Sequence, residues 1–152
     1  GRMIEMQAVI GRIQLRRLGD WTRARRSNAE RIWAAARDLR GLRVPTVPQW
    51  AEHAAYRAYV FVRPEMLAAG WDRNRIVAEI AALGVPCFSG TCPEVYLEKA
   101  FDGTGWRPKE RLPVARELGE TGLVFLVHPN LAERNISKAC EVMATVLGMA
   151  TR

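Results

Sequence analysis

The chain has 152 residues, 49% of them hydrophobic and 26% charged, which is the balance of a single globular domain. Its net charge is +7, but no helix-turn-helix, zinc-finger or aromatic RNA-binding motif accompanies the arginines, so the charge alone does not favour nucleic-acid binding. No apolar run approaches the roughly 20 residues of a membrane helix, and no signal peptide is recognisable at the start. The three cysteines are irregularly spaced, so they predict neither a metal site nor a disulfide framework. We expect them to be reduced thiols in the cytoplasm.

A long helix is predicted over the first 41 residues, from residue 3 to about residue 40, with Gly41 as its stop. Apolar residues recur along one face at three- and four-residue spacing: Ile4, Ala8, Val9, Ile13, Leu18 and Trp21, then Ala29, Ile32, Trp33, Ala36 and Leu39. Beside this face we expect an exposed apolar strip of Met3, Met6 and Ile10. No Ser, Thr, Asp or Asn precedes the first periodic residue as a cap, so we expect the chain to be part of a longer protein.

Residues 42–152 are predicted to form an α/β sandwich, with breaks at Pro and Gly residues. The predicted segments are an extended connection (43–50), a strand (54–64), a helix (71–84), a short extended segment with a loop (85–93), a helical turn (94–101), a polar loop (102–111), a helix (113–122), a buried strand (123–129) and a final helix (130–148). The predicted fold class is α+β, in which the long N-terminal helix is followed by a small three-stranded, mainly antiparallel sheet packed by helices.

The predicted helix ends depend on four residues. Asp72 is the expected N-cap of the helix over 71–84, and Gly84 is its expected stop. Pro113 is well placed in the first turn of the helix over 113–122. Asn130 is the expected cap of the final helix.

Three stretches of the chain resemble one known family. They are, in family order and at family spacing, "RMIEMQAVIGRIQLRRLGDW", "GVPCFSGTCPEVYLEKAF" and "LPVARELGETGLVFLVHPNL". Together they span nearly all of the sequence, and they are similar to segments in the C-terminal part of the DegT/StrS-type sugar aminotransferases, which use pyridoxal phosphate.

The resemblance implies that residues 1–152 are the C-terminal small domain of such an enzyme, connected through the helix over 1–41 to a large domain. In this family the large domain carries the cofactor pocket and the catalytic lysine, so we expect this chain alone to bind no pyridoxal phosphate, to hold no catalytic residue and to be inactive. Its lysines, Lys99, Lys109 and Lys138, are expected to be surface cations. The whole protein would be a homodimer that moves an amino group from an amino acid to a keto-sugar nucleotide, for polysaccharide or secondary-metabolite biosynthesis.

The resemblance also implies candidate site residues. Arg2 falls at a family position near the subunit interface and the cofactor. Arg57 falls beside the active site, where a guanidinium can pair with a phosphate or carboxylate, and an ordinary exposed strand arginine is the alternative. The family's substrate loop is matched by Ser89, Thr91, Glu94 and Tyr96. Their hydroxyl and carboxylate groups suit sugar hydroxyls, and the alternative is that they only shape a turn.

The substrate loop departs from the family pattern. Two family histidines fall on Thr91 and Tyr96, and a family tyrosine falls on Cys92. Because an imidazole contact is lost, we expect the amino acceptor to differ from the common nucleotide sugars. His128 matches a family histidine after the last strand and is expected to hold the turn into the final helix.

Two other functions stay open on the sequence alone. The domain could be a free-standing binding or scaffold module, or a basic nucleic-acid-binding domain that uses the arginines of "RIQLRRLGDWTRARR". A reading frame that continues into a lysine-bearing domain would favour the aminotransferase.

Overall fold

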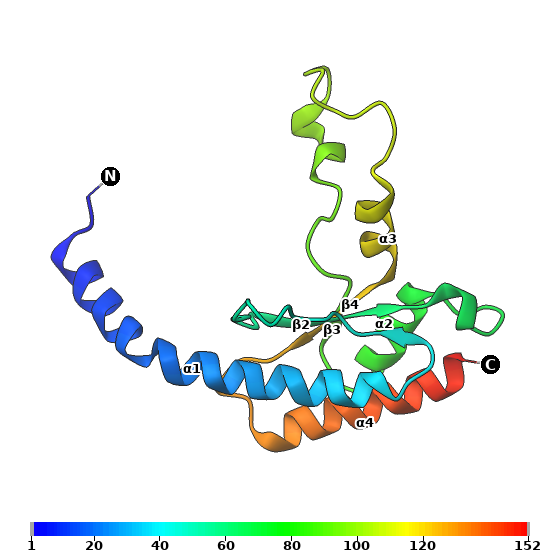
Figure 1. The fold of residues 1–152 in the computed structure, drawn as a ribbon, viewed down its shortest axis with the longest axis horizontal. Coiled ribbons are helices and arrows are strands. Elements are labelled where there is room, and N and C mark those ends of the chain that lie inside the picture. The colour runs from blue at the N-terminus through cyan, green and yellow to red at the C-terminus, as the bar shows by residue number, and fades with distance from the viewer. Residues whose placement is uncertain (1, 152) are drawn as a thin grey trace.

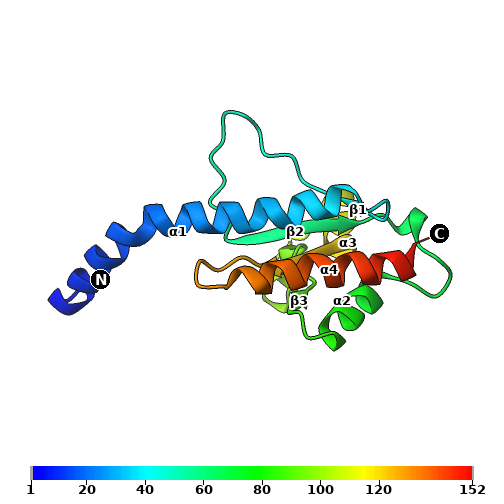
Figure 2. The same cartoon turned by 90° about the horizontal axis from the view of Figure 1, so that it is seen from below.

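The computed structural model describes residues 2–151, so Gly1 and Arg152, at the ends of the predicted domain, lie outside the described residues. The helices and strands, in chain order, are α1 (Glu5–Arg37), β1 (Leu42–Arg43), β2 (Arg57–Val62), α2 (Arg73–Ala82), β3 (Cys87–Phe88), α3 (Pro113–Thr121), β4 (Gly122–Leu126) and α4 (Glu133–Ala150). Short 3₁₀ turns are η1 (Pro64–Met66), η2 (Val95–Leu97) and η3 (Lys99–Phe101). Helices α1, α4 and α2 lie side by side under one face of a sheet, and α3 lies over the other face (Figures 1 and 2).

The sheet has four strands in the order β1-β2-β4-β3, and every neighbouring pair is antiparallel. The predicted number of three strands is therefore wrong, while the α+β class and the antiparallel pairing are confirmed. The additional strand is β1, which pairs Leu42 with Val62 and Arg43 with Phe61. The sequence does not predict it, because two residues are too few to show an alternating pattern and Pro45 follows two residues after Arg43 in an extended connection.

The core lies between the sheet and the helices beneath it. Along β2 the exposure alternates, because successive side chains of a strand point to opposite faces: Ala58, Val60 and Val62 are buried, and the residues between them are half-buried. Buried side chains of α1 and α4 complete the core: Ala29, Ile32, Trp33, Ala36, Ile136, Met143, Val146 and Leu147. This leaves the opposite face of the sheet, called here the open face, for Arg57, Tyr59, Phe61, Phe88 and Leu126.

Helix α1 confirms the predicted long helix, but it ends at Arg37, four residues before the predicted stop at Gly41, and only its second half is buried. With 33 residues it is about 50 Å long at about 1.5 Å per residue, and its N-terminal half extends beyond the sheet (Figures 1 and 2). Met3, Met6 and Ile10 are exposed as expected, with exposed fractions of 71%, 70% and 51%. The neighbouring predicted apolar face is also exposed, because no described segment reaches it; it includes Ile4, Val9, Ile13 and Leu18. No helix among residues 2–151 is both long and apolar enough to cross a bilayer.

The helix ends confirm most of the predicted caps. Asp72 Oδ1 accepts a 2.7 Å hydrogen bond from the Arg75 N–H, and Gly84 ends the turn after α2 at a φ of +77° that favours glycine. The prediction that Asn130 caps α4 is wrong. The residue at the N-cap is Ala132, whose N–H donates to Asn135 Oδ1, because Asn130 is held in the preceding turn.

Candidate functional site

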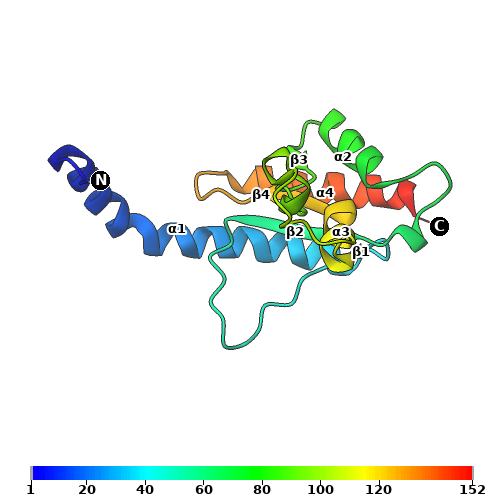
Figure 3. The same cartoon turned by 90° about the horizontal axis from the view of Figure 1, so that it is seen from above.

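The most prominent feature of the molecule is an arm, defined here as residues 91–111. It leaves the sheet after β3, carries the short turns η2 and η3, and returns to the body at α3. The arm stands over the open face of the sheet, on the side away from α1 and α4 (Figures 1 and 3). It contains Thr91, Glu94 and Tyr96, and Ser89 precedes it by two residues.

Arg57 lies on the same side of the sheet as the arm. It is the first residue of β2, pairs with Leu126 on β4, and shares its face with Tyr59 and Phe61. Its guanidinium carbon lies 5.5 Å from the centre of the Tyr56 ring, which is a cation–π contact. The guanidinium keeps its hydrogen-bond donors free of partners among residues 2–151.

Ser89 and Thr91 stand at the root of the arm, and both are exposed. Within the described range neither hydroxyl has a protein hydrogen-bond partner. The backbone here is anchored to α2, because the Ser89 carbonyl accepts a hydrogen bond from Arg73 Nη1 at 3.3 Å. Next to it, Gly90 has a φ of +98° and packs over Tyr59, so the root lies directly on the open face. The backbone beside both residues is therefore anchored at Ser89 and Gly90, and their hydroxyls remain available to a ligand.

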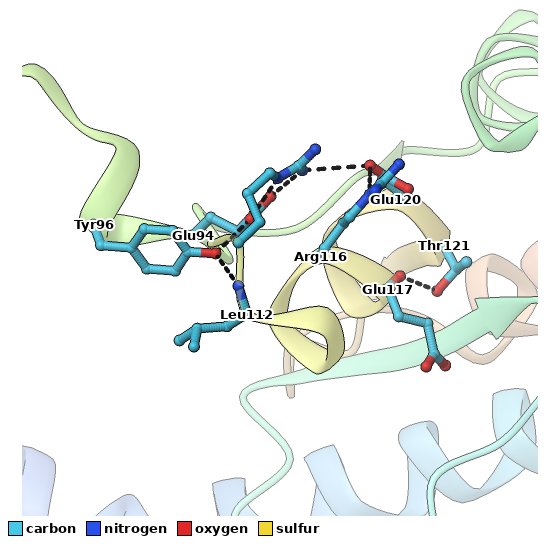
Figure 4. Close-up of polar contacts among 8 residues, drawn as sticks. Glu94, Tyr96, Leu112, Arg116, Glu117, Glu120 and Thr121 are labelled. Atoms are coloured by element: carbon cyan, nitrogen blue, oxygen red, sulfur yellow. Dashed lines mark hydrogen bonds and ion pairs between the residues drawn. The ribbon is translucent and has the colours of Figure 1, made fainter. Parts of the chain in front are cut away.

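Glu94 and Tyr96 differ from these two, because their polar atoms bind other parts of the chain (Figure 4). Arg111 binds both carboxylate oxygens of Glu94, through Nε to Oε1 at 2.9 Å and through Nη2 to Oε2. The Tyr96 hydroxyl donates to Glu94 Oε1 at 2.6 Å and accepts from the Leu112 N–H at 2.9 Å. The hydrogen bonds from Arg111 and then Tyr96 lower the pKa of Glu94 to about 2.

The sequence reasoning missed three arginines that organise the arm. Arg111 holds Glu94. Arg107 donates to the backbone carbonyls of Tyr96, Leu97 and Glu98, at 2.8, 2.9 and 3.1 Å. Arg73, at the start of α2, donates to the carbonyls of Ser89 and Gly122 and so joins the ends of β3 and α3. A loop arginine carries no periodic pattern, so only the coordinates reveal these contacts.

A cleft of about 630 Å³ lies beside Arg111, between the end of β2 and α3. Its charged lining consists of Arg43, Arg63, Arg111, Arg116, Glu65, Glu117 and Glu120. These charges largely pair with one another, as Arg43 with Glu117 at 3.0 Å and Arg116 with Glu120 at 2.9 Å. We therefore interpret the cleft as part of the packing between α3 and the sheet.

Arg2 is not brought together with the other candidates. It is exposed, precedes α1, and lies at the end of that helix farthest from the sheet (Figure 1). The predicted set therefore separates into Arg2 at the end of α1 and a group over the open face. His128 lies in the turn before α4, where its Nδ1 accepts from the Asn130 N–H at 3.3 Å.

The chain is similar to known proteins in both sequence and fold. Residues 1–144 match the model of the DegT/DnrJ/EryC1/StrS aminotransferase family. The chain belongs to this family. An aminotransferase of known structure from Psychrobacter cryohalolentis is 52% identical to this family member, with a TM-score of 0.92. The similarity covers 97% of the present chain and 39% of the Psychrobacter protein.

Two more distant relatives match over a similar share of their length. The erythromycin biosynthesis sensory transduction protein EryC1 of Saccharopolyspora erythraea is 28% identical over 145 residues. These residues are 95% of the present chain and 36% of EryC1. DesV of S. venezuelae has the same fold, with a TM-score of 0.82 at 20% identity over 96% of this chain and 37% of DesV. The chain thus spans only 36% to 39% of the length of these three proteins.

Proposed function

We propose that the chain is the C-terminal small domain of a pyridoxal-phosphate-dependent sugar aminotransferase. The observation that carries this proposal is the similarity to the Psychrobacter aminotransferase, which includes nearly all of this chain but only 39% of that protein. The whole protein would transfer an amino group from an amino acid to a keto-sugar nucleotide.

The cofactor is assigned to a part of the whole protein outside this chain. Pyridoxal phosphate needs a lysine for its Schiff base, a carboxylate at the ring nitrogen and a phosphate cradle. Lys99 and Lys109 are exposed in the arm and Lys138 is exposed on α4, so the residues of this chain do not fit the cofactor by themselves. Arg2, at the far end of α1, is the residue we assign to the edge of the cofactor site in a homodimer.

The open face and the root of the arm are assigned to the acceptor. The free hydroxyls of Ser89 and Thr91 are suited to sugar hydroxyls, which both donate and accept hydrogen bonds. Arg57 stands on the same face with a guanidinium whose fork geometry matches a phosphate oxygen pair. A keto-sugar nucleotide carries both kinds of group.

Absorbance spectroscopy with pyridoxal phosphate tests whether the cofactor binds to a part of the whole protein outside residues 1–152. The whole protein should give a Schiff-base band that survives dialysis, whereas residues 1–152 alone should give none. A stable band in residues 1–152 would contradict the assignment of the cofactor to another domain. A whole protein without such a band would instead favour a binding or scaffold module, and retention of DNA or RNA on a filter at physiological salt would favour the nucleic-acid alternative.

A further inference from the structure

The contacts of Glu94 and Tyr96 leave little for a ligand to bind. The Glu94 side chain is only 10% exposed, and both of its oxygens are bound by Arg111. A tyrosine hydroxyl has one proton to donate, and that of Tyr96 is donated to Glu94. The same hydroxyl accepts from the Leu112 N–H. A bidentate, charge-assisted pair of this kind is among the stronger hydrogen-bonded contacts in proteins, and its geometry is specific.

This cluster lies where the arm joins the body of the molecule. Glu94 stands near the start of the arm and Arg111 at its end. Their ion pair therefore joins the two ends of the arm where it meets the body of the molecule. Pro93 packs on Gly119 of α3 immediately beside the pair. Thr91 is three residues before Glu94, and its backbone is therefore restrained from one side by this cluster and from the other by the root at Ser89.

We propose that Glu94, Tyr96 and Arg111 form a clamp that closes the base of the arm and positions Ser89 and Thr91 over the open face. The three side chains are positioning residues and do not touch the substrate. Their effect on the acceptor rests on the proposed function, whereas the clamp itself is a property of this fold.

Limited trypsin digestion of the whole protein, read by mass spectrometry, tests the clamp without any activity. Cleavage after Lys99 and Lys109 reports opening of the arm, because both lysines lie within it and trypsin needs a locally unfolded stretch of backbone, not only an exposed side chain. Glu94→Gln or Arg111→Gln should speed cleavage at both sites about tenfold or more, since each removes a charged hydrogen-bond pair. Arg43→Gln is the matched control: it removes a guanidinium that lines the neighbouring cleft and pairs with Glu117, which makes no contact with the clamp, and it should leave both rates unchanged.

The double variant Glu94→Gln with Arg111→Gln separates a pair from two independent residues. Two residues that act only through each other give a double variant no more susceptible than either single one. Additive effects of the two substitutions on the cleavage rates would overturn the pairing. Unchanged cleavage in both single variants would overturn the clamp.

Kinetics then distinguish positioning from direct contact. Tyr96→Phe keeps the ring and removes the hydroxyl that joins Glu94 to the Leu112 N–H. If Tyr96 positions the arm, Tyr96→Phe should both raise the Michaelis constant for the acceptor and speed cleavage at Lys99 and Lys109. Glu94→Gln should reproduce both changes. A raised Michaelis constant with normal cleavage would show direct substrate contact and overturn the proposal for Tyr96. Faster cleavage in a protein that aminates no sugar would refute the proposed function and leave the clamp standing.

Discussion

Gly119 provides a sharp test of how tightly the arm is packed on α3. Glycine is a poor residue in a helix, so Gly→Ala at an open position stabilises by about 0.5–1 kcal/mol. A Cβ at Gly119, however, would collide with Cγ of Pro93 and lie 3.1 Å from its Cβ. Proline is a rigid ring that cannot rotate away. Overpacking of this kind costs about 1–3 kcal/mol, so Gly119→Ala should destabilise the chain by about 1 kcal/mol once the helix gain is subtracted.

Gly148 in α4 is the matched control. It also lies near the C-terminal end of a helix, but nothing lies within 4 Å of a Cβ built there. Gly148→Ala should therefore stabilise the chain by about 0.5–1 kcal/mol. At about 2–4 °C per kcal/mol for a chain of this size, the two variants should melt several degrees apart on opposite sides of the parent. Thermal unfolding followed by circular dichroism measures this. A Gly119→Ala variant as stable as Gly148→Ala would show that Pro93 moves freely and would refute the packing argument.

Three further predictions concern single residues. Asp72→Ala should cost about 1 kcal/mol in urea unfolding, because the α2 N-cap bond is lost, while Asp72→Asn should cost far less; equal losses would refute the cap. Because the pKa of Glu94 falls from its ordinary 4.5 to about 2 on folding, its contribution to stability is full above pH 4.5 and is lost as the pH falls toward 2. The melting temperatures of the parent and of Glu94→Gln should therefore differ at neutral pH and converge through that range, and a constant difference would exclude ionised Glu94 as its source. Thiol titration should find Cys92 first, because it is exposed, whereas burial raises the pKa of Cys87 to about 11 and delays its reaction until unfolding; early labelling of Cys87 would contradict its burial.

The sequence predicts local features of this fold well and spatial ones poorly. The helix ends at Asp72, Gly84 and Pro113 follow from side-chain and backbone preferences within one turn, so the pattern contains the necessary information. The predicted cap of α4 is wrong because residue type alone favours Asn130, whereas the turn around His128 places Asn130 two residues before the N-cap. Strand β1 exists only because β2 is available as its partner.

The candidate site shows the same division. Family resemblance indicated Ser89 and Thr91, and the structure leaves their hydroxyls open beside the face that carries Arg57. The clamp could not be predicted, because Glu94 and Arg111 belong to two irregular segments, 17 residues apart, that meet only in the folded arm. Irregular segments have no periodicity from which such a meeting could be inferred.

Transfer of a labelled amino nitrogen tests the central claim most directly. The whole protein, loaded with pyridoxal phosphate, would be incubated with glutamate labelled at its amino nitrogen and with a panel of keto-sugar nucleotides, and the products would be analysed by mass spectrometry. The proposed function predicts that the label appears in at least one amino-sugar nucleotide, and that Arg57→Ala raises the Michaelis constant for that acceptor. A cofactor-loaded protein that transfers the label to no keto-sugar nucleotide would contradict it.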